Sequence, residues 1–218
     1  MPSCGCMKTK TLLVIDSSAR AKRSTTRALT ARFAAAWKAR FGDGSVLHRD
    51  LGANPPRAID QEWISAAFEK EDADPRALAE SEVLIEELFR ADVIVIGAPM
   101  YNFGMPGVLK GYIDQIVRSG RTFDFTDSDE NPYTPLVPSR PVVAITSKGS
   151  GEYEPGGVME SLNFLEPHLA TVFGFIGLGD IRFVKVAREE YKDEQWKQMV
   201  ADAEQAVDEF AAQLGSDS

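Results

Sequence analysis

Hydrophobic residues along this chain form short apolar runs that alternate with longer segments of helical periodicity. Runs rich in Val, Ile and Leu predict five strands, at residues 11–16, 45–51, 92–98, 141–147 and 181–187. Apolar residues at helical spacing predict helices at residues 24–41, 59–70, 76–89, 105–119, 162–173 and 189–214. Short apolar strands of this kind are typical of parallel sheets covered on both faces.

This alternation predicts one α/β domain over residues 11–218, preceded by a disordered tail at residues 1–10. We expect a doubly wound, five-stranded parallel sheet with strand order 2-1-3-4-5. Ligands of such sheets bind beyond the carboxyl ends of the strands, where the strand order reverses. The loops after the first, third and fourth strands meet at that point, and they are the candidate site.

Composition excludes several classes of function. A formal net charge of −9 argues against nucleic-acid binding, which needs a basic face. The chain shows no apolar leader and no run long enough to cross a bilayer, so we expect a cytoplasmic protein without a membrane partner. The two cysteines, Cys4 and Cys6, lack further ligands for a structural metal, and no metal site is expected.

The third strand ends at Pro99 and is followed by a loop with aromatic and amide side chains. Its residues Met100, Tyr101, Asn102 and Phe103 combine flat side chains with free backbone N–H groups. That combination suits a planar ring rich in heteroatoms, such as a flavin. The alternative is a plain turn whose aromatic side chains pack in the core.

The loop after the first strand carries hydroxyl groups at both ends and leads directly into a helix. Ser18 lies at its start, and Ser24, Thr25 and Thr26 lie at its end. Free N–H groups at a helix N-terminus bind anions, so a terminal phosphate is expected here. Neither the P-loop nor the dinucleotide motif is present. Alternatively, Ser24 only caps the helix and the basic residues face water. The choice for Arg20, Lys22 and Arg23 stays open between a ribose phosphate, the phosphate of a bound flavin nucleotide and solvent.

The loop after the fourth strand is short, and apart from the lysine its side chains are small: Ser147, Lys148, Gly149 and Ser150. Its backbone can approach a ligand closely, and its N–H groups can stabilise negative charge on a reduced ring. Lys148 either adds a positive charge there or faces solvent.

Together these residues resemble a known family. The matching stretches are residues 98–103 (APMYNF), 109–114 (LKGYID), 118–123 (RSGRTF), 145–147 (ITS) and 173–177 (FGFIG). They resemble the FMN-dependent NADH-azoreductase, or NADH:quinone oxidoreductase, family, in unbroken order from Thr11 to Ala187. The family commonly has Ser-Gln-Ser where this chain has Ser24-Thr25-Thr26, and Ser-Arg-Gly-Gly where it has Ser147-Lys148-Gly149-Ser150.

The resemblance implies a flavodoxin-like homodimer that binds FMN at its interface. FMN would be reduced by NADH or NADPH and reoxidised by a quinone or an azo compound. Ser18, Ser24, Thr25 and Thr26 match the phosphate positions of the family. Met100, Tyr101, Asn102 and Phe103 match ring contacts, and Ser147, Lys148, Gly149 and Ser150 match the loop at the pyrimidine end.

Several predictions concern residues outside the three loops. The long segment at residues 121–138 is expected to be a flap or hairpin whose Phe123, Phe125 and Tyr133 wall the substrate pocket, within the chain or across a dimer interface. The alternative is that these side chains only pack within the loop. No side chain is assigned as a catalytic acid or base, because a flavin carries the electrons itself. His48 and His168 are expected to be structural.

Two alternatives stay open on the residues alone. A flavodoxin-type electron carrier would bind FMN without turning over a substrate. A serine hydrolase would use Ser17 or Ser18, although no G-x-S-x-G motif is present.

Overall fold

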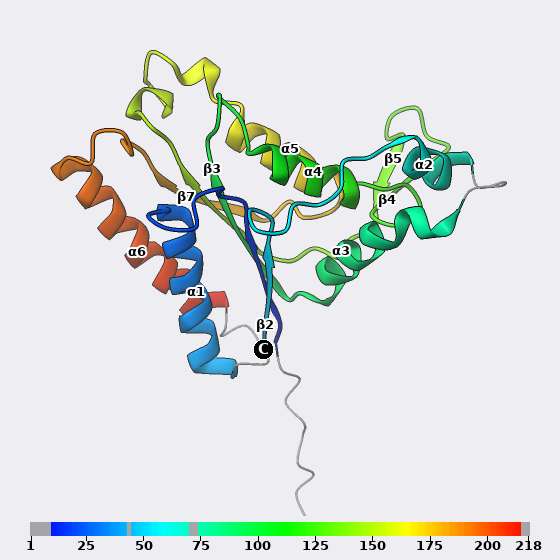
Figure 1. The fold of residues 1–218 in the computed structure, drawn as a ribbon, viewed down its shortest axis with the longest axis horizontal. Helices are drawn as coiled ribbons and strands as arrows, with labels where there is room; N and C mark the ends of the chain where they lie inside the picture. The colour runs from blue at the N-terminus through cyan, green and yellow to red at the C-terminus, as the bar shows by residue number, and fades with distance from the viewer. Residues whose placement is uncertain (1–9, 43–44, 70–73, 215–218) are drawn as a thin grey trace, which may run out of the picture.

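The structure is a computed structural model that describes residues 10–42, 45–69 and 74–214. Its main sheet has five parallel strands in the order β2-β1-β3-β6-β7 (Figure 1). The strands are β1 (Leu12–Asp16), β2 (Val46–Asp50), β3 (Val93–Pro99), β6 (Val142–Ser147) and β7 (Ile181–Val186). Counting main-sheet strands along the chain, this is the predicted order 2-1-3-4-5, which is therefore confirmed.

Helices cover the two faces of the sheet in separate layers (Figure 1). One layer holds α1 (Thr25–Phe41) and α6 (Glu194–Leu214), and the other holds α3 (Ala79–Arg90), α4 (Gly107–Ile116) and α5 (Leu165–Phe175). Side chains of β1 alternate between the layers: Leu12 and Val14 pack with α1 and α6, whereas Leu13 and Ile15 pack with α3, α4 and α5. Alternation along a strand explains why every residue of β1 is buried.

The segment between β2 and β3 is less regular than the two predicted helices. In place of the helix predicted at residues 59–70, the structure has a short α2 (Gln61–Ile64), which continues as a π-helical turn, Ser65–Glu69; residue 70 lies outside the described residues. Residues 76–89 begin with a 3₁₀ turn, Pro75–Leu78, before α3. Proline has no N–H and fits only a first helical turn, and the Asp74 side chain accepts a hydrogen bond from Arg76 N.

Three predicted helix starts lie too early. α5 begins at Leu165 instead of residue 162. α4 begins at Gly107 instead of residue 105, because Pro106 has an extended backbone. α6 begins at Glu194 instead of residue 189. Arg188 and Lys192 adopt left-handed backbone angles, and the Asp193 carboxylate caps the helix by accepting from Trp196 N at 2.9 Å. Residues 188–193 are therefore a loop at the carboxyl end of β7.

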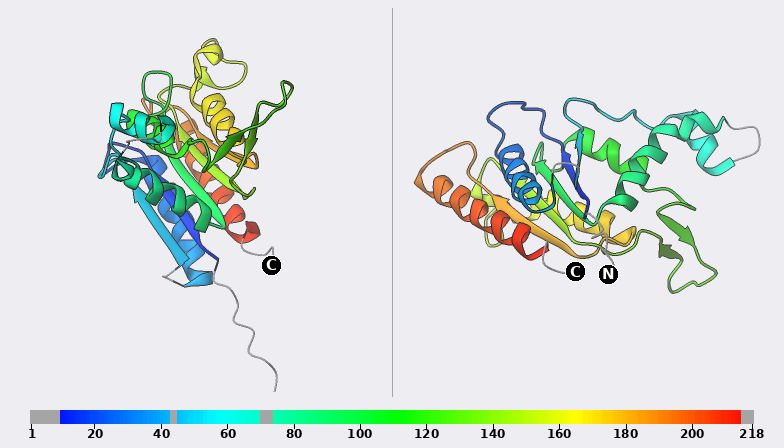
Figure 2. Two further views of the ribbon diagram at one scale, coloured as in Figure 1. Left: turned by 90° about the vertical axis from the view of Figure 1, so that its right-hand side faces the viewer. Right: turned by 90° about the horizontal axis from the view of Figure 1, so that it is seen from below.

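The long segment after α4 contains an antiparallel hairpin, as predicted. Its strands are β4 (Phe123–Phe125) and β5 (Tyr133–Pro135). The hairpin projects from the body, on the side away from α1 and α6 (Figure 2). Two further 3₁₀ turns, Gly151–Tyr153 and Glu160–Leu162, follow β6.

The predicted tail, with Cys4 and Cys6, falls on residues 1–9, outside the described residues. Within the described ranges, no helix is both long and apolar enough to cross a membrane.

Candidate cofactor site

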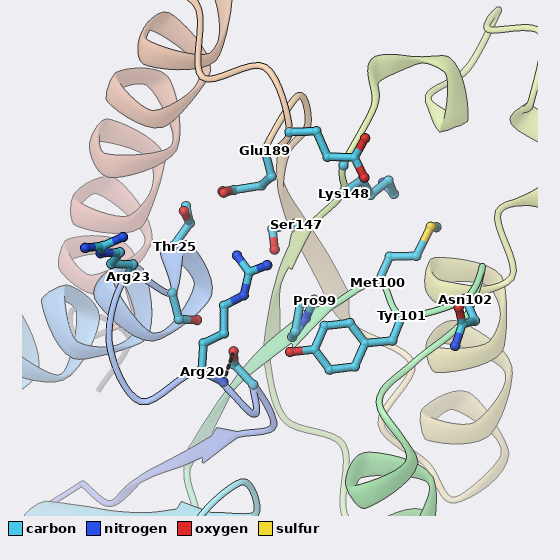
Figure 3. A pocket seen from close by; sticks show the side chains of 14 residues that line it. Arg20, Arg23, Thr25, Pro99, Met100, Tyr101, Asn102, Ser147, Lys148 and Glu189 are labelled. Carbon is cyan, nitrogen blue, oxygen red and sulfur yellow. Dashed lines mark hydrogen bonds between the residues drawn. The ribbon is translucent and has the colours of Figure 1, made fainter.

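A cavity of about 370 Å³ opens at the carboxyl ends of β1, β3 and β6 (Figure 3). All three predicted loops contribute to its wall. The predicted residues that line it are Ser18, Ser24, Thr25, Met100, Tyr101, Asn102, Ser147, Lys148 and Gly149. The structure therefore brings together residues separated by up to about 130 positions in the sequence, as the sheet order requires.

The loop after β1 ends at the N-terminus of α1. Ser24 is the N-cap residue, and its Oγ accepts a hydrogen bond from Arg27 N at 3.4 Å. The N–H groups of Thr25 and Thr26 precede the first intrahelical hydrogen bonds, so they have no partner within the helix. Thr26 is fully buried and does not line the cavity, and its Oγ1 lies 3.2 Å from Ser24 Oγ. Ser24 can therefore cap the helix through Arg27 N while the N–H groups of Thr25 and Thr26 stay available for an anion.

Arg27 holds the start of this loop in place. Its guanidinium donates to the Ser18 carbonyl, at 3.2 Å from Nε and 2.8 Å from Nη2. It also binds the Asp50 carboxylate through both Nη atoms, at 2.7 and 2.6 Å. The hydrogen bond from Arg27 lowers the pKa of Asp50. Gly52 leaves room for this clamp, because a Cβ there would lie 2.3 Å from the Ser18 carbonyl oxygen.

The loop after β3 is a tight two-residue turn. Tyr101 and Gly104 exchange backbone hydrogen bonds of 2.9 and 3.1 Å, and the two central residues, Asn102 and Phe103, have φ of +48° and +72°. Such a turn favours Asn or Gly at both positions, so Phe103 is strained by about 1–3 kcal/mol. Within the described ranges, neither Asn102 N–H nor Phe103 N–H has a hydrogen-bond partner.

The β1 and β3 loops also contact each other. Tyr101 lines the cavity, and its hydroxyl accepts a hydrogen bond from Ala19 N at 3.3 Å. Phe103, in contrast, does not line the cavity. Its ring is 42% exposed and meets Tyr153 edge to face, with 6.1 Å between ring centres.

Lys148 is buried, so the predicted alternative of a solvent-facing side chain is wrong. Its ammonium pairs with the carboxylates of Glu154 and Glu166. Thr146 Oγ1 also donates to Glu166, at 2.7 Å. Burial alone raises the pKa of Glu166, but the hydrogen bonds from Lys148 and Thr146 outweigh burial and lower it. The ammonium therefore neutralises protein carboxylates and is not a free charge for a ligand.

The rest of this loop is held by the segment after β7. Glu189 N donates to the Lys148 carbonyl at 3.0 Å, and Glu190 N donates to the Gly149 carbonyl at 3.1 Å. Gly149 N–H has no partner within the described part of the chain. Ser150 does not line the cavity; its hydroxyl caps the following 3₁₀ turn by accepting from Glu152 N at 3.2 Å.

Comparison with known proteins gives a consistent result. A family model described as a flavodoxin-like fold matches residues 10–210. An FMN-dependent NADH:quinone oxidoreductase of Opitutus terrae is 46% identical over 95% of this chain and 99% of its own length. A second protein of that name, from Colwellia psychrerythraea, is 37% identical over 94% of this chain and 99% of its own length. The chain belongs to the FMN-dependent NADH:quinone oxidoreductase family.

Solved structures show the same fold. The azoreductase of Bacillus anthracis str. Sterne has a TM-score of 0.83 at 20% identity, covering 94% of this chain and 99% of that one. An FMN-dependent NADH-azoreductase from the Ames Ancestor strain, in complex with FMN, has a TM-score of 0.82 at 20% identity, covering 95% and 100%.

Some residues that line the cavity of this quinone oxidoreductase family member were not predicted as site residues. Arg20 and Arg23 were left open between a ribose phosphate, the FMN phosphate and solvent, and both line the wall. Pro99 was recognised only as the end of β3. Glu189 and Glu190 were assigned to the first turn of a helix, and their place in the wall follows from the later start of α6. The Asp193 cap, three residues before Trp196, is the sequence signal for that start.

The predicted substrate-pocket residues lie elsewhere within the chain. Phe123, Phe125 and Tyr133 are absent from the cavity wall and form an aromatic cluster with Phe175 of α5. Phe125 and Tyr133 are 60% and 47% exposed. The hairpin carries them away from the sheet edge that holds the cavity (Figures 1 and 2). These residues do not line the cavity of their own chain, and their role in a substrate pocket, which the sequence also allowed across a dimer interface, stays a prediction.

A serine hydrolase is contradicted by the surroundings of both serines. Ser17 is buried and donates to the Gly97 carbonyl at 2.7 Å. His48 Nε2 lies 2.8 Å from Asp16 Oδ2, and this hydrogen bond raises the pKa of His48. His168 is exposed on α5. Among the described residues, neither Ser17 nor Ser18 is hydrogen-bonded to a histidine.

Proposed function

We propose that this chain is an FMN-dependent oxidoreductase that takes two electrons from NADH or NADPH and gives them to quinones or aromatic azo compounds. One observation carries the proposal: a single cavity has unpartnered backbone donors at the N-terminus of α1 and at the turns after β3 and β6. The names of the Opitutus and Colwellia relatives give FMN, NADH and quinone as cofactor, donor and acceptor.

The end of the cavity near α1 suits a phosphate. Thr25 and Thr26 offer helix N-terminal N–H groups, and Ser18 and Ser24 offer hydroxyls. Arg20 and Arg23 add positive charge beside them (Figure 3). A single phosphate at a helix N-terminus is the part of FMN that needs such a site.

The other end suits the flavin ring. Met100 and Tyr101 supply flat or polarisable surface, and the turn at Asn102 directs unpartnered N–H groups outward. Gly149 N–H is a donor from the facing loop. When bound, FMN supplies the redox chemistry by accepting a hydride and passing two electrons on. The chain's own task is to hold the ring and to stabilise negative charge on it with backbone donors.

We also propose a homodimer whose interface completes the substrate pocket. Apolar side chains beside the cavity are exposed: Phe103 by 42%, Phe164 by 57% and Val158 by 87%. The exposed aromatic residues of the β4–β5 hairpin are available to the partner in the same way. The cysteine-free body fits a reducing compartment, and we place the enzyme in the cytoplasm.

Steady-state oxidation of NADH by FMN-loaded protein, with a simple quinone as acceptor, tests this function. We expect quinone-dependent turnover, and reduction of an azo dye by the same protein. A protein that binds FMN but oxidises no NADH or NADPH with either acceptor would be an electron carrier, and this outcome would overturn the proposal.

A further inference from the structure

Glu189 places an acidic side chain in the wall of the cavity without a partner from the protein. Its Oε1 is buried and has no hydrogen-bond partner among the described residues. Figure 3 shows Glu189 above Ser147, between the loop that carries Arg20 and Thr25 and the loop that carries Met100 and Asn102. Leaving a buried carboxylate oxygen without a donor is costly, so such an atom calls for an explanation.

Backbone hydrogen bonds hold the loop that carries Glu189 at the edge of the cavity. Residues 188–193 are a loop and not a helical turn, and the hydrogen bonds from Glu189 N and Glu190 N fasten it to Lys148 and Gly149. Glu190 lies against the same turn, since a Cβ on Gly149 would be 2.6 Å from Glu190 Oε1. The backbone of Glu189 is therefore held at the cavity wall.

A carboxylate only accepts hydrogen bonds, so its missing partner must be a donor. Cations are close at hand, and Arg20 and Arg23 line the same cavity, but among the described residues none of them forms an ion pair with Glu189. Lys148 is paired with Glu154 and Glu166, and Arg188 is paired with Asp193. FMN carries two kinds of donor: the hydroxyls of its ribityl chain and the N3–H of its ring.

We propose that Glu189 is a further FMN-binding residue, whose carboxylate accepts a hydrogen bond from a ribityl hydroxyl or from the ring N3–H. This inference rests on the proposed function. It assigns a contact outside the three loops that the sequence identified. It also gives the first residues after β7 a role in selecting a ligand with donors at that position.

The test compares FMN affinity with stability of the apoprotein. Glu189→Ala removes the acceptor, and Glu189→Gln keeps one acceptor oxygen without the charge. The control is Glu194→Gln, which removes a charge from an 88% exposed side chain at the start of α6. FMN dissociation constants come from quenching of flavin fluorescence, and urea midpoints are measured without flavin.

We expect E189A to weaken FMN binding roughly 10-fold to 100-fold, the loss typical of one hydrogen bond to a charged group. E189Q should recover part of that loss, and E194Q should bind like wild type. The apoprotein of E189A should have a urea midpoint no lower than wild type, because no protein hydrogen bond of the side chain is lost. A residue that only supports the fold would lower the midpoint and the affinity together.

Riboflavin and lumiflavin identify the donor. If the donor is a ribityl hydroxyl, E189A weakens FMN and riboflavin but not lumiflavin, which lacks the ribityl chain. If the donor is N3–H, all three weaken. FMN binding by E189A that equals or exceeds that of wild type overturns the inference but leaves the proposed function intact. Wild-type protein that binds no FMN overturns both.

Discussion

Lys148 is a fully buried positive charge beside the proposed cofactor cavity, and its ammonium lies between Glu154 and Glu166. Lys185 extends the cluster, with its Nζ 3.5 Å from Glu154 Oε2. Removing one partner of a buried ion pair costs more than the pair contributes, because the remaining charge stays buried. The cluster links the turn after β6 to α5, and it fixes the backbone donors of that turn.

Lys148→Met should therefore destabilise the protein by about 3–5 kcal/mol. The double variant K148M/E166Q should recover much of this loss, because it leaves no buried charge at Glu166.

The same cluster makes stability depend on pH. The fold lowers the pKa of Glu166, so the ionised carboxylate stabilises the protein at pH values above the pKa of Glu166 in the unfolded chain. This stabilisation is lost as the pH falls through the pKa of Glu166 in the folded protein. In K148M, Glu166 loses the partner that lowers its pKa, so we expect the destabilisation to be largest near neutral pH and to shrink as Glu166 becomes protonated at lower pH. Urea unfolding between pH 3 and 7 checks both points, and a double variant no more stable than K148M would contradict the pairing.

The sequence could not reveal this cluster. From the sequence, an exposed loop position for Lys148 is as plausible as a buried one. Its partner Glu166 lies on a helix 18 positions later. Burial and pairing of a charge depend on how α5 packs against β6, which no local pattern encodes. In contrast, the hydroxyls of Ser24 and Thr25 were predictable, because capping and anion binding are local properties of a helix N-terminus.

At the scale of elements, the loop after β1 depends on contacts from α1 and from the end of β2. Arg27 joins the Ser18 carbonyl to Asp50, and Gly52 leaves space for that approach. The cavity-lining groups of this loop are thus positioned by residues that do not line the cavity themselves.

Arg27→Met should weaken FMN binding by about 10-fold, because the Ser18 carbonyl and the Asp50 carboxylate lose their shared donor. The matched control is Arg32→Met on the same helix. Arg32 is 43% exposed and pairs with Glu204 and Asp208 of α6. FMN titration of both variants checks this; an equal loss in R32M would show a general effect on α1 instead of a specific clamp.

Element types and strand order were predictable, whereas several boundaries were not. Apolar runs such as residues 93–97 mark strands buried on both faces, and their alternation with helices leaves few topologies. The start of α6 was misplaced because Glu189 and Glu190 resemble an acidic first helical turn. Hydrogen bonds to Lys148 and Gly149 override that local preference, and the error concealed two residues of the cavity wall.

At the scale of the whole molecule, the β4–β5 hairpin projects from the body (Figure 2). Its Phe125 and Tyr133 are exposed, and neither lines the cavity of its own chain. The prediction that this segment forms a hairpin is confirmed, and its role in a substrate pocket stays a prediction, because its aromatic side chains do not line the cavity of their own chain. A sequence does not tell whether a projecting segment serves its own chain or a second copy.

If a partner's hairpin completes the pocket, the double variant F125A/Y133A should lower kcat/KM for quinones at least about 10-fold, with little change in FMN affinity. Sedimentation equilibrium should show a dimer for wild-type protein. A monomeric wild type with full activity, or a variant with unchanged kcat/KM, would contradict the shared pocket.

The central claim is that FMN occupies the cavity between the loops after β1, β3 and β6. A crystal structure of the protein grown with FMN tests it most directly. We predict one FMN in each chain, with its phosphate at the N–H groups of Thr25 and Thr26 and its ring against residues 100–103. A flavin bound elsewhere on the chain, or bound with its phosphate away from α1, would contradict the account.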